Sequence, residues 1–142
     1  MQKVLVAFDG SESSIRALRF VVEQPKAARP SELHLLNVQD YPIVISEYVT
    51  SSMIEAIRRG QTEHSREVLA RGVALLESSG IPHHEHVVIG FPGTAITEQA
   101  AALGCGQIVM GTRGLGMVKG LVLGSVAQRV IHLSPVPVTL VK

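Results

Sequence analysis

One segment of the sequence is rich in residues suited to bind phosphate. Residues 111–125 read GTRGLGMVKGLVLGS, with five glycines, the cations Arg113 and Lys119, and a final serine, Ser125. Glycine lets a backbone approach a ligand closely and adopt positive φ angles. A helix that begins near Ser125 adds unpaired N–H groups and a partial positive charge, which favour an anion. The segment is therefore a candidate phosphate cradle.

The spacing of these glycines also fits a flexible loop that binds no ligand. Two better-known glycine motifs do not match. A P-loop requires Gly-Lys followed by Ser or Thr, whereas Lys119 and Gly120 are followed by Leu121. The dinucleotide fingerprint requires a third glycine where Lys119 stands, and it belongs after the first strand of a domain. On residue types alone, the phosphate cradle and the empty loop both remain open.

The elements that would position this segment alternate along the chain. Short apolar runs predict strands at residues 3–8, 32–38, 84–89, 107–110 and 136–141. Helical patterns separate these runs, and the longest covers residues 44–79. This order predicts an α/β fold with a parallel sheet covered by helices on both faces. With 142 residues the chain fits one domain, residues 1–142.

Two predicted strands end beside residues that could take part in ligand binding. Phe8 is followed by Asp9, and Met110 is followed by Gly111. Open α/β sheets bind ligands at the carboxyl ends of their strands, near the point where strand order reverses. Asp before Gly is also common in turns. The position of Asp9 at a strand end beside a candidate site favours a binding role.

The last predicted strand, Val136–Val141, contains Pro137. Proline has no N–H to donate, so the strand is expected at an edge of the sheet or to begin at that residue. An apolar edge is open to pairing with another chain. Homodimerisation through Val136–Val141 is one expectation, and cover by the chain's own loops is the other.

Composition excludes several classes of protein. Thirteen Lys and Arg against twelve Asp and Glu give a net charge of +1, and the chain has three Phe, two Tyr and no Trp. These numbers provide neither a basic strip nor a stacking platform for nucleic acid. No apolar run approaches the length of a membrane span, and the N-terminus lacks a signal-peptide pattern. Cys105, the single cysteine, cannot form an internal disulfide, so a cytoplasmic protein is expected.

A histidine-rich stretch, His83-His84-Glu85-His86, raises the question of a metal. In a strand, His84 and His86 share a face, as two ligands of a zinc ion would. No third or fourth ligand is evident nearby in the sequence. A solvated start of a strand is therefore the favoured interpretation, and His34 is expected to be a core or helix-facing residue with its hydrogen bonds satisfied.

The sequence resembles the universal stress protein family over essentially its whole length. Four stretches carry the resemblance: KVLVAFDGSESS, LHLLNV, IVMGTRG and SPVPVTLV. The most specific feature is the motif of the UspA-like, ATP-binding branch, in which Gly, two residues, Gly, nine residues and Gly are followed by Ser or Thr. Its positions are all met, by Gly111, Gly114, Gly124 and Ser125.

The resemblance implies a three-layer, Rossmann-like sandwich of the adenine nucleotide alpha hydrolase-like type, with five parallel strands in the order 3-2-1-4-5. ATP would lie over the ends of strands 1, 2 and 4, with Mg²⁺ held mainly by the phosphates. Asp9 would approach the adenosine, the backbone near Val38 would read adenine, and Ala7 would line the base pocket. Ribose and phosphates would be held from one side by Met110, Gly111, Arg113 and Gly114, and from the other by Gly124, Ser125 and Val126.

Two departures from the family pattern leave every motif position intact. Related proteins often have proline where Ala7 stands and an acidic residue where Gln107 stands. The first could loosen the base pocket, and the second lies at the start of strand 4, away from the phosphates. The dimer contact that the resemblance implies, through the last strand, agrees with the edge argument from Pro137.

The implied function is an ATP-binding regulatory module of the stress response. The alternatives are a slow ATPase or nucleotidyl-transfer enzyme using the same pocket, and a dimeric interaction module without a ligand. Phosphoryl transfer needs a positioned base or water-orienting group, and Asp9 is the only evident carboxylate. Binding with at most weak hydrolysis is therefore expected. Because ordering a glycine-rich loop costs backbone entropy, residues 112–121 are expected to be mobile without nucleotide and ordered with it.

Overall fold

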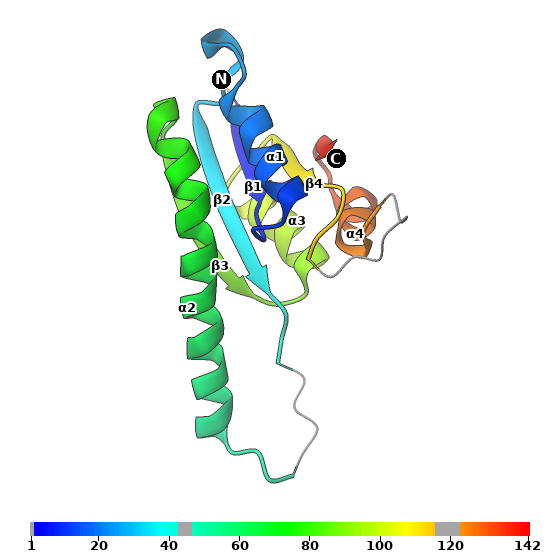
Figure 1. Cartoon of the computed structure of the whole chain (residues 1–142). Coiled ribbons are helices and arrows are strands. Elements are labelled where there is room, and N and C mark those ends of the chain that lie inside the picture. Colours follow the sequence, from blue (N-terminus) through cyan, green and yellow to red (C-terminus); the bar gives the residue numbers. More distant parts are fainter. Residues whose placement is uncertain (1, 43–46, 116–122) are drawn as a thin grey trace.

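Strands and helices alternate in the computed structural model of the protein, which describes residues 2–42, 47–115 and 123–142 (Figure 1). The strands are β1 (Lys3–Ala7), β2 (Glu32–Gln39), β3 (His83–Ile89), β4 (Gln107–Gly111) and β5 (Val138–Val141). The α-helices are α1 (Glu12–Val22), α2 (Ser51–Leu76), α3 (Pro92–Ala102) and α4 (Ser125–Leu133). Two short 3-10 helices are η1 (Lys26–Ala28) and η2 (Glu77–Ser79). The predicted β/α alternation is confirmed.

The sheet has the order β3-β2-β1-β4-β5, and every pair of neighbouring strands is parallel. This confirms the order 3-2-1-4-5. In the centre, Ala7 of β1 lies opposite Leu36 of β2 on one side and Met110 of β4 on the other. Strand order reverses between β1 and β4, so the carboxyl ends of these strands are the place where an open α/β sheet binds ligands.

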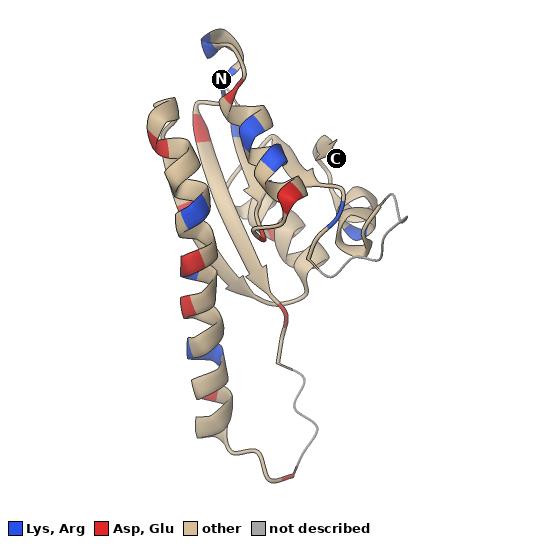
Figure 2. Ribbon diagram, viewed as in Figure 1, with Lys and Arg blue, Asp and Glu red and all other residues tan. Residues whose placement is uncertain are grey.

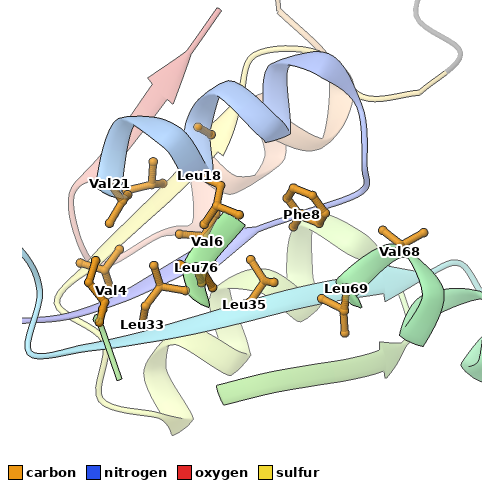
Figure 3. Packing of buried hydrophobic residues seen from close by; sticks show 13 residues of the cluster. Val4, Val6, Phe8, Leu18, Val21, Leu33, Leu35, Val68, Leu69 and Leu76 are labelled. Carbon is orange, nitrogen blue, oxygen red and sulfur yellow. The ribbon is translucent and has the colours of Figure 1, made fainter. Parts of the chain in front are cut away.

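Each face of the sheet carries its own hydrophobic core. On one face, strand residues such as Val6 and Leu35 pack with Leu18 of α1 and with Leu69 of α2 (Figure 3). On the other face, a second cluster joins strands β1, β2 and β4 to α3 and α4; it includes Leu5, Leu36, Ile96, Ile108 and Val130. Because both faces are covered, consecutive strand residues are buried, which explains the nearly continuous apolar runs in the sequence.

The long helix α2 begins later than expected. The sequence predicted helix from residue 44, but the structure starts it at Ser51, after Thr50, whose hydroxyl accepts a hydrogen bond from the N–H of Met53 at 3.3 Å. An N-cap of this kind fixes where a helix begins. Residues 43–46 lie outside the described residues.

The first half of α2 extends beyond the sheet (Figure 1), and all its buried residues come at Ser65 or later. Acidic and basic side chains are interspersed along this helix (Figure 2). In the described parts of the chain, no helix combines the length and the apolar composition needed to cross a membrane.

Strand β5 is an edge strand, as Pro137 predicted. It begins at Val138, two residues later than expected from the sequence. The carbonyl of Pro137 still accepts a hydrogen bond from Ile108 of β4, at 3.0 Å, so the residue that cannot donate is placed just outside the ladder. Homodimerisation through this edge stays a prediction.

Candidate functional site

A cavity of about 330 Å³ lies at the carboxyl ends of β1, β2 and β4. This volume falls at the lower end of the range for small-molecule sites, roughly 300–1,000 Å³. Each residue that the sequence analysis selected lines it: Ala7, Asp9, Val38, Met110, Gly111, Arg113, Gly114, Gly124, Ser125 and Val126. The cavity therefore brings together residues from both ends of the sequence.

One wall of the cavity is apolar. It is formed by Ala7, Leu36, Val38 and Met110 from the strands and by Ile96 from α3. Most of these residues belong to, or pack against, the hydrophobic cluster between the sheet and helices α3 and α4. A wall of this kind suits a flat apolar group such as a ring, because contact with it removes apolar surface from water.

The turn between β1 and α1 holds the start of the glycine-rich loop. The Oδ1 atom of Asp9 accepts a hydrogen bond from the N–H of Ser11 at 2.9 Å, as in a turn, and its Oδ2 atom accepts one from the N–H of Leu115 at 3.2 Å. The hydroxyl of Ser13 donates to the carbonyl of Arg113. Asp9 thus has the turn role that the sequence left open, and it also tethers the loop beside the cavity.

Two motif glycines are required by close packing. A Cβ atom at Gly111 would lie 2.8 Å from the carbonyl carbon and the Cβ of Ser13, in the first turn of α1. At Gly114, a Cβ would lie 2.9 Å from Oδ2 of Asp9. Such contacts are shorter than atoms in folded proteins tolerate, so a side chain at Gly111 would force the first turn of α1 away from the loop. A side chain at Gly114 would instead displace the carboxylate of Asp9 and disturb its hydrogen bond with Leu115.

The N-terminus of α4 opens into the cavity. Its N-cap is Gly124, with φ −73° and ψ 158°, and within the described residues no side chain caps the helix. By contrast, α1 is capped by Ser11, whose hydroxyl accepts from the N–H of Ser14 at 3.3 Å. The first N–H groups of an uncapped helix lack partners within the helix and carry partial positive charge. This end of α4 can therefore bind an anion.

Backbone hydrogen bonds join the two halves of the motif. The N–H of Gly124 donates to the carbonyl of Thr112 at 2.7 Å, and the N–H of Thr112 donates to the carbonyl of Val141 in β5 at 2.9 Å. The ends of the loop are thus side by side, and both line the cavity. Lys119, the second predicted cation, and residues 116–122, on which the expected change in mobility mostly falls, lie outside the described residues.

Several residues that line the cavity were not predicted from the sequence. Asp40 follows β2, Pro92 begins α3, and His64 comes from the middle of α2. Asp40 and Pro92 could have been found because each lies within three residues of a strand end. His64 carries no such signal, since it is separated from β2 by 24 residues and only the packing of α2 brings it to the cavity.

A second polar cluster lies at the opposite end of the sheet. The carboxylate of Glu32 lies 3.4 Å from Nζ of Lys3, 3.1 Å from Nε2 of His34 and 3.2 Å from Nε2 of His84. His34 is buried, as predicted; its Nδ1 lies 2.9 Å from Nε2 of His86, whereas its Nε2 is not aligned for a hydrogen bond. Across the described residues, no three His, Cys, Asp or Glu side chains are arranged to hold a metal ion.

Burial lowers the pKa of His34 and of His86, and neighbouring histidines lower both further. For His34 the carboxylate of Glu32 acts in the opposite direction but does not outweigh burial. Partial burial alone would raise the pKa of Glu32, but Lys3 and the histidines outweigh it and lower that pKa. The cluster thus favours neutral His34 and His86 beside an ionised Glu32.

Known proteins of one family share the fold and much of the sequence of this chain. The chain matches the universal stress protein family over residues 1–142. A universal stress protein of Thermus aquaticus is 34% identical over 140 residues, 98% of this chain and 97% of that protein. The structure of MJ0577 from Methanocaldococcus jannaschii is 29% identical, with a TM-score of 0.84 over 99% of this chain and 95% of that one. A universal stress protein solved in complex with cAMP is 26% identical, with a TM-score of 0.64 over 99% and 95% of the two chains. This chain belongs to the universal stress protein family.

Proposed function

We propose that the cavity binds an adenine nucleotide, ATP with Mg²⁺, and that the protein is an ATP-binding regulatory module of the stress response. One observation carries the proposal. The motif residues Gly111, Gly114, Gly124 and Ser125 come from two ends of a loop, and they meet in one cavity around the uncapped N-terminus of α4. The likeness to a family member solved with cAMP supports a nucleotide as the ligand.

The geometry suits a nucleotide laid across the strand ends. The phosphates would take the N-terminus of α4, with the hydroxyl of Ser125 and the guanidinium of Arg113 as further donors. The base would lie on the apolar wall, near Val38 at the end of β2. Since β2 and β4 flank β1, their ends are about 10 Å apart, a distance that a nucleoside phosphate can span. Mg²⁺ would be bound mainly by the phosphates.

Binding is favoured over efficient catalysis. Asp9 and Asp40 are the carboxylates among the lining residues, and Asp40 follows β2, away from the N-terminus of α4 where the phosphates are proposed to lie. Both oxygens of Asp9 already accept N–H hydrogen bonds, from Ser11 and Leu115, so this carboxylate acts as a tether. Phosphoryl transfer needs a group free to orient the attacking nucleophile. We therefore propose at most weak hydrolysis; a slow ATPase or nucleotidyl transferase in the same cavity is the alternative.

We further propose that the protein is a cytoplasmic homodimer that pairs through the edge strand β5. All four β5 residues are only partly buried in the single chain, and no strand among the described residues pairs with its outer edge. An apolar edge of this kind is commonly covered by a second chain. Nucleotide in the neighbouring cavity can influence this edge, because Thr112 connects Val141 to Gly124 through hydrogen bonds.

Calorimetric titration of Mg-ATP into nucleotide-stripped protein tests the proposal. Micromolar affinity, about 8 kcal/mol, is expected for the unmodified protein. Gly124→Val should lose it, because a branched side chain would fill the space in front of the α4 N–H groups. Gly60→Ala, at a helix position with open space around it, is the matched control and should bind normally. The absence of binding by the unmodified protein at millimolar ATP would refute the nucleotide proposal.

A further inference from the structure

Helix α2 is fixed to the end of β2 by two side-chain hydrogen bonds. The amide Nε2 of Gln61 donates to the carbonyl of Asp40 at 2.7 Å. One turn later, the hydroxyl of Ser65 donates to Oδ1 of Asn37 at 2.6 Å, and both residues are buried. His64 lies between these two attachment points on the helix. Its position relative to the end of β2 is therefore set from both sides.

The attachment extends to the central strand. Nδ2 of Asn37 donates to the carbonyl of Phe8 at 2.8 Å, at the end of β1, and Nε2 of Gln39 donates to Oδ1 of Asn37 at 2.9 Å. A buried, hydrogen-bonded network of this kind rigidifies the groups it joins. The ends of β1 and β2 and the middle of α2 thus form one framework, and His64 extends from it.

His64 lines the cavity but has no role in the core. The residue is exposed, so packing does not account for its position. Its neighbours along the cavity wall, Val38, Gln39 and Asp40, belong to the β2 end. The uncapped N-terminus of α4 lies on the other side of β1. An imidazole can donate a hydrogen bond from one nitrogen and accept one at the other, which suits the mixed donors and acceptors of a base or sugar.

We propose that His64 contacts the nucleoside part of the bound nucleotide and helps to determine which nucleosides the protein accepts. The inference rests on the proposed nucleotide function and deepens it. With phosphates at the N-terminus of α4, the sugar and base extend toward β2, where the imidazole of His64 can form a hydrogen bond with either. The contribution of His64 should then be the same whatever the number of phosphates.

Four ligands that differ in their number of phosphates test whether the contribution of His64 is independent of the phosphates. For adenosine, AMP, ADP and ATP, His64→Leu should weaken binding by a similar factor, about fivefold, as expected for one neutral hydrogen bond. His64→Gln, which keeps a donor and an acceptor, should recover part of the loss. Glu63→Gln, at the adjacent exposed position outside the cavity lining, is the matched control and should bind as the unmodified protein does.

Modified nucleosides show whether His64 contacts the base or the sugar. Binding of 2′-deoxyadenosine and of purine riboside, which lacks the amino group, is compared in the unmodified protein and in His64→Leu. The ligand that loses no further affinity in His64→Leu identifies the group that His64 contacts. Gln61→Ala, which removes the attachment to Asp40 but keeps the imidazole, should cause a smaller loss with the same pattern.

Two outcomes would overturn the inference while the proposed function stands. One is equal affinity of the unmodified protein and His64→Leu for all four ligands. The other is a loss that grows from adenosine to ATP, because that would place His64 at the phosphates. Failure of the unmodified protein to bind any of the four ligands is a different result, since it would overturn the proposed function as well. Thermal unfolding of each variant shows whether a loss of binding reflects a loss of folding.

Discussion

Polar residues lie at both ends of the sheet, but the two groups of residues interact differently. At the carboxyl end, the uncapped N–H groups of α4 and the imidazole of His64 border an open cavity. At the amino end, the carboxylate of Glu32 is surrounded by Lys3, His34 and His84, so its partners come from the protein itself. Most polar groups of the amino-end cluster have partners inside the protein, although Nε2 of His34 is not aligned for a hydrogen bond, whereas the groups that border the open cavity are available to a ligand.

The two ends of the sheet also differ in the ion that each could bind, a metal ion at the histidines or a phosphate at the glycines. His84 and His86 do lie near each other around His34, with ring centroids 5.4 Å and 5.1 Å from it. Their nitrogens, however, have other partners: Nε2 of His84 lies 3.2 Å from the carboxylate of Glu32, and Nε2 of His86 lies 2.9 Å from Nδ1 of His34. At the glycine segment, by contrast, Gly111 and Gly114 let the loop pack closely against Ser13 and Asp9. The N-terminus of α4 has no side-chain cap among the described residues, so its N–H groups can bind an anion.

The largest expected effect is at Gly111. Gly111→Val places a branched side chain against the backbone of Ser13 and should lower the free energy of unfolding by about 3 kcal/mol, with loss of nucleotide binding. Gly60→Ala is the control: it lies in a helix with open space around it and should raise the free energy of unfolding by up to about 1 kcal/mol. Urea unfolding measures both. A fully stable Gly111→Val variant would show that the β1–α1 turn is not held as closely as described.

A smaller effect is expected at Asp9, where the carboxylate holds two N–H groups. Asp9→Ala should lower the free energy of unfolding by about 1–2 kcal/mol, because both hydrogen bonds are lost. Asp9→Asn keeps one carbonyl oxygen for the N–H of Ser11 and should retain most of the stability while releasing Leu115. Faster amide exchange at Leu115 in Asp9→Asn, measured by NMR, is the sharper test. Unchanged exchange there would contradict the tether.

The smallest expected effect is a pH dependence of the free energy of unfolding. It should arise only from the polar cluster at the amino ends of the strands. Burial lowers the pKa of His34 and His86 below the ordinary value of 6.5, so the unfolded chain binds protons more readily. Their contribution to stability is complete above about pH 6.5 and is lost as pH falls toward the lowered values. Glu32, whose pKa is also lowered, adds a further loss below its ordinary value of 4.5.

Urea unfolding at pH 7.5, 6.5 and 5.5 measures this dependence. His34→Gln, which removes one of the two imidazoles whose pKa is lowered, should reduce the slope of unfolding free energy against pH. Because the cluster lies at the far end of the sheet, the variant should leave nucleotide affinity at pH 7.5 unchanged. An equal slope in both proteins would show that the acid sensitivity arises elsewhere, and a loss of nucleotide affinity would show that the two ends are coupled.

Local sequence patterns were sufficient to predict much of the fold. The alternation of apolar runs and helical patterns predicted the parallel sheet, and Pro137 predicted an edge strand, because both depend on properties of neighbouring residues. The spacing of Gly111, Gly114, Gly124 and Ser125 selected residues that the structure brings into one cavity. The start of α2 was misplaced, since the apolar pattern continues before Thr50 and only the cap at that residue sets the boundary.

The amino-acid sequence by itself determined the fold class, the strand ends that carry the cavity and the motif that lines it. Only the tertiary structure decided which distant residues join them. Gly111 must be small because α1 packs against it, and His64 reaches the cavity because Gln61 and Ser65 fix α2 to β2. The physical reason is that periodicity and spacing report on neighbours along the chain, whereas close packing and hydrogen bonds between separate elements exist only once the elements have docked.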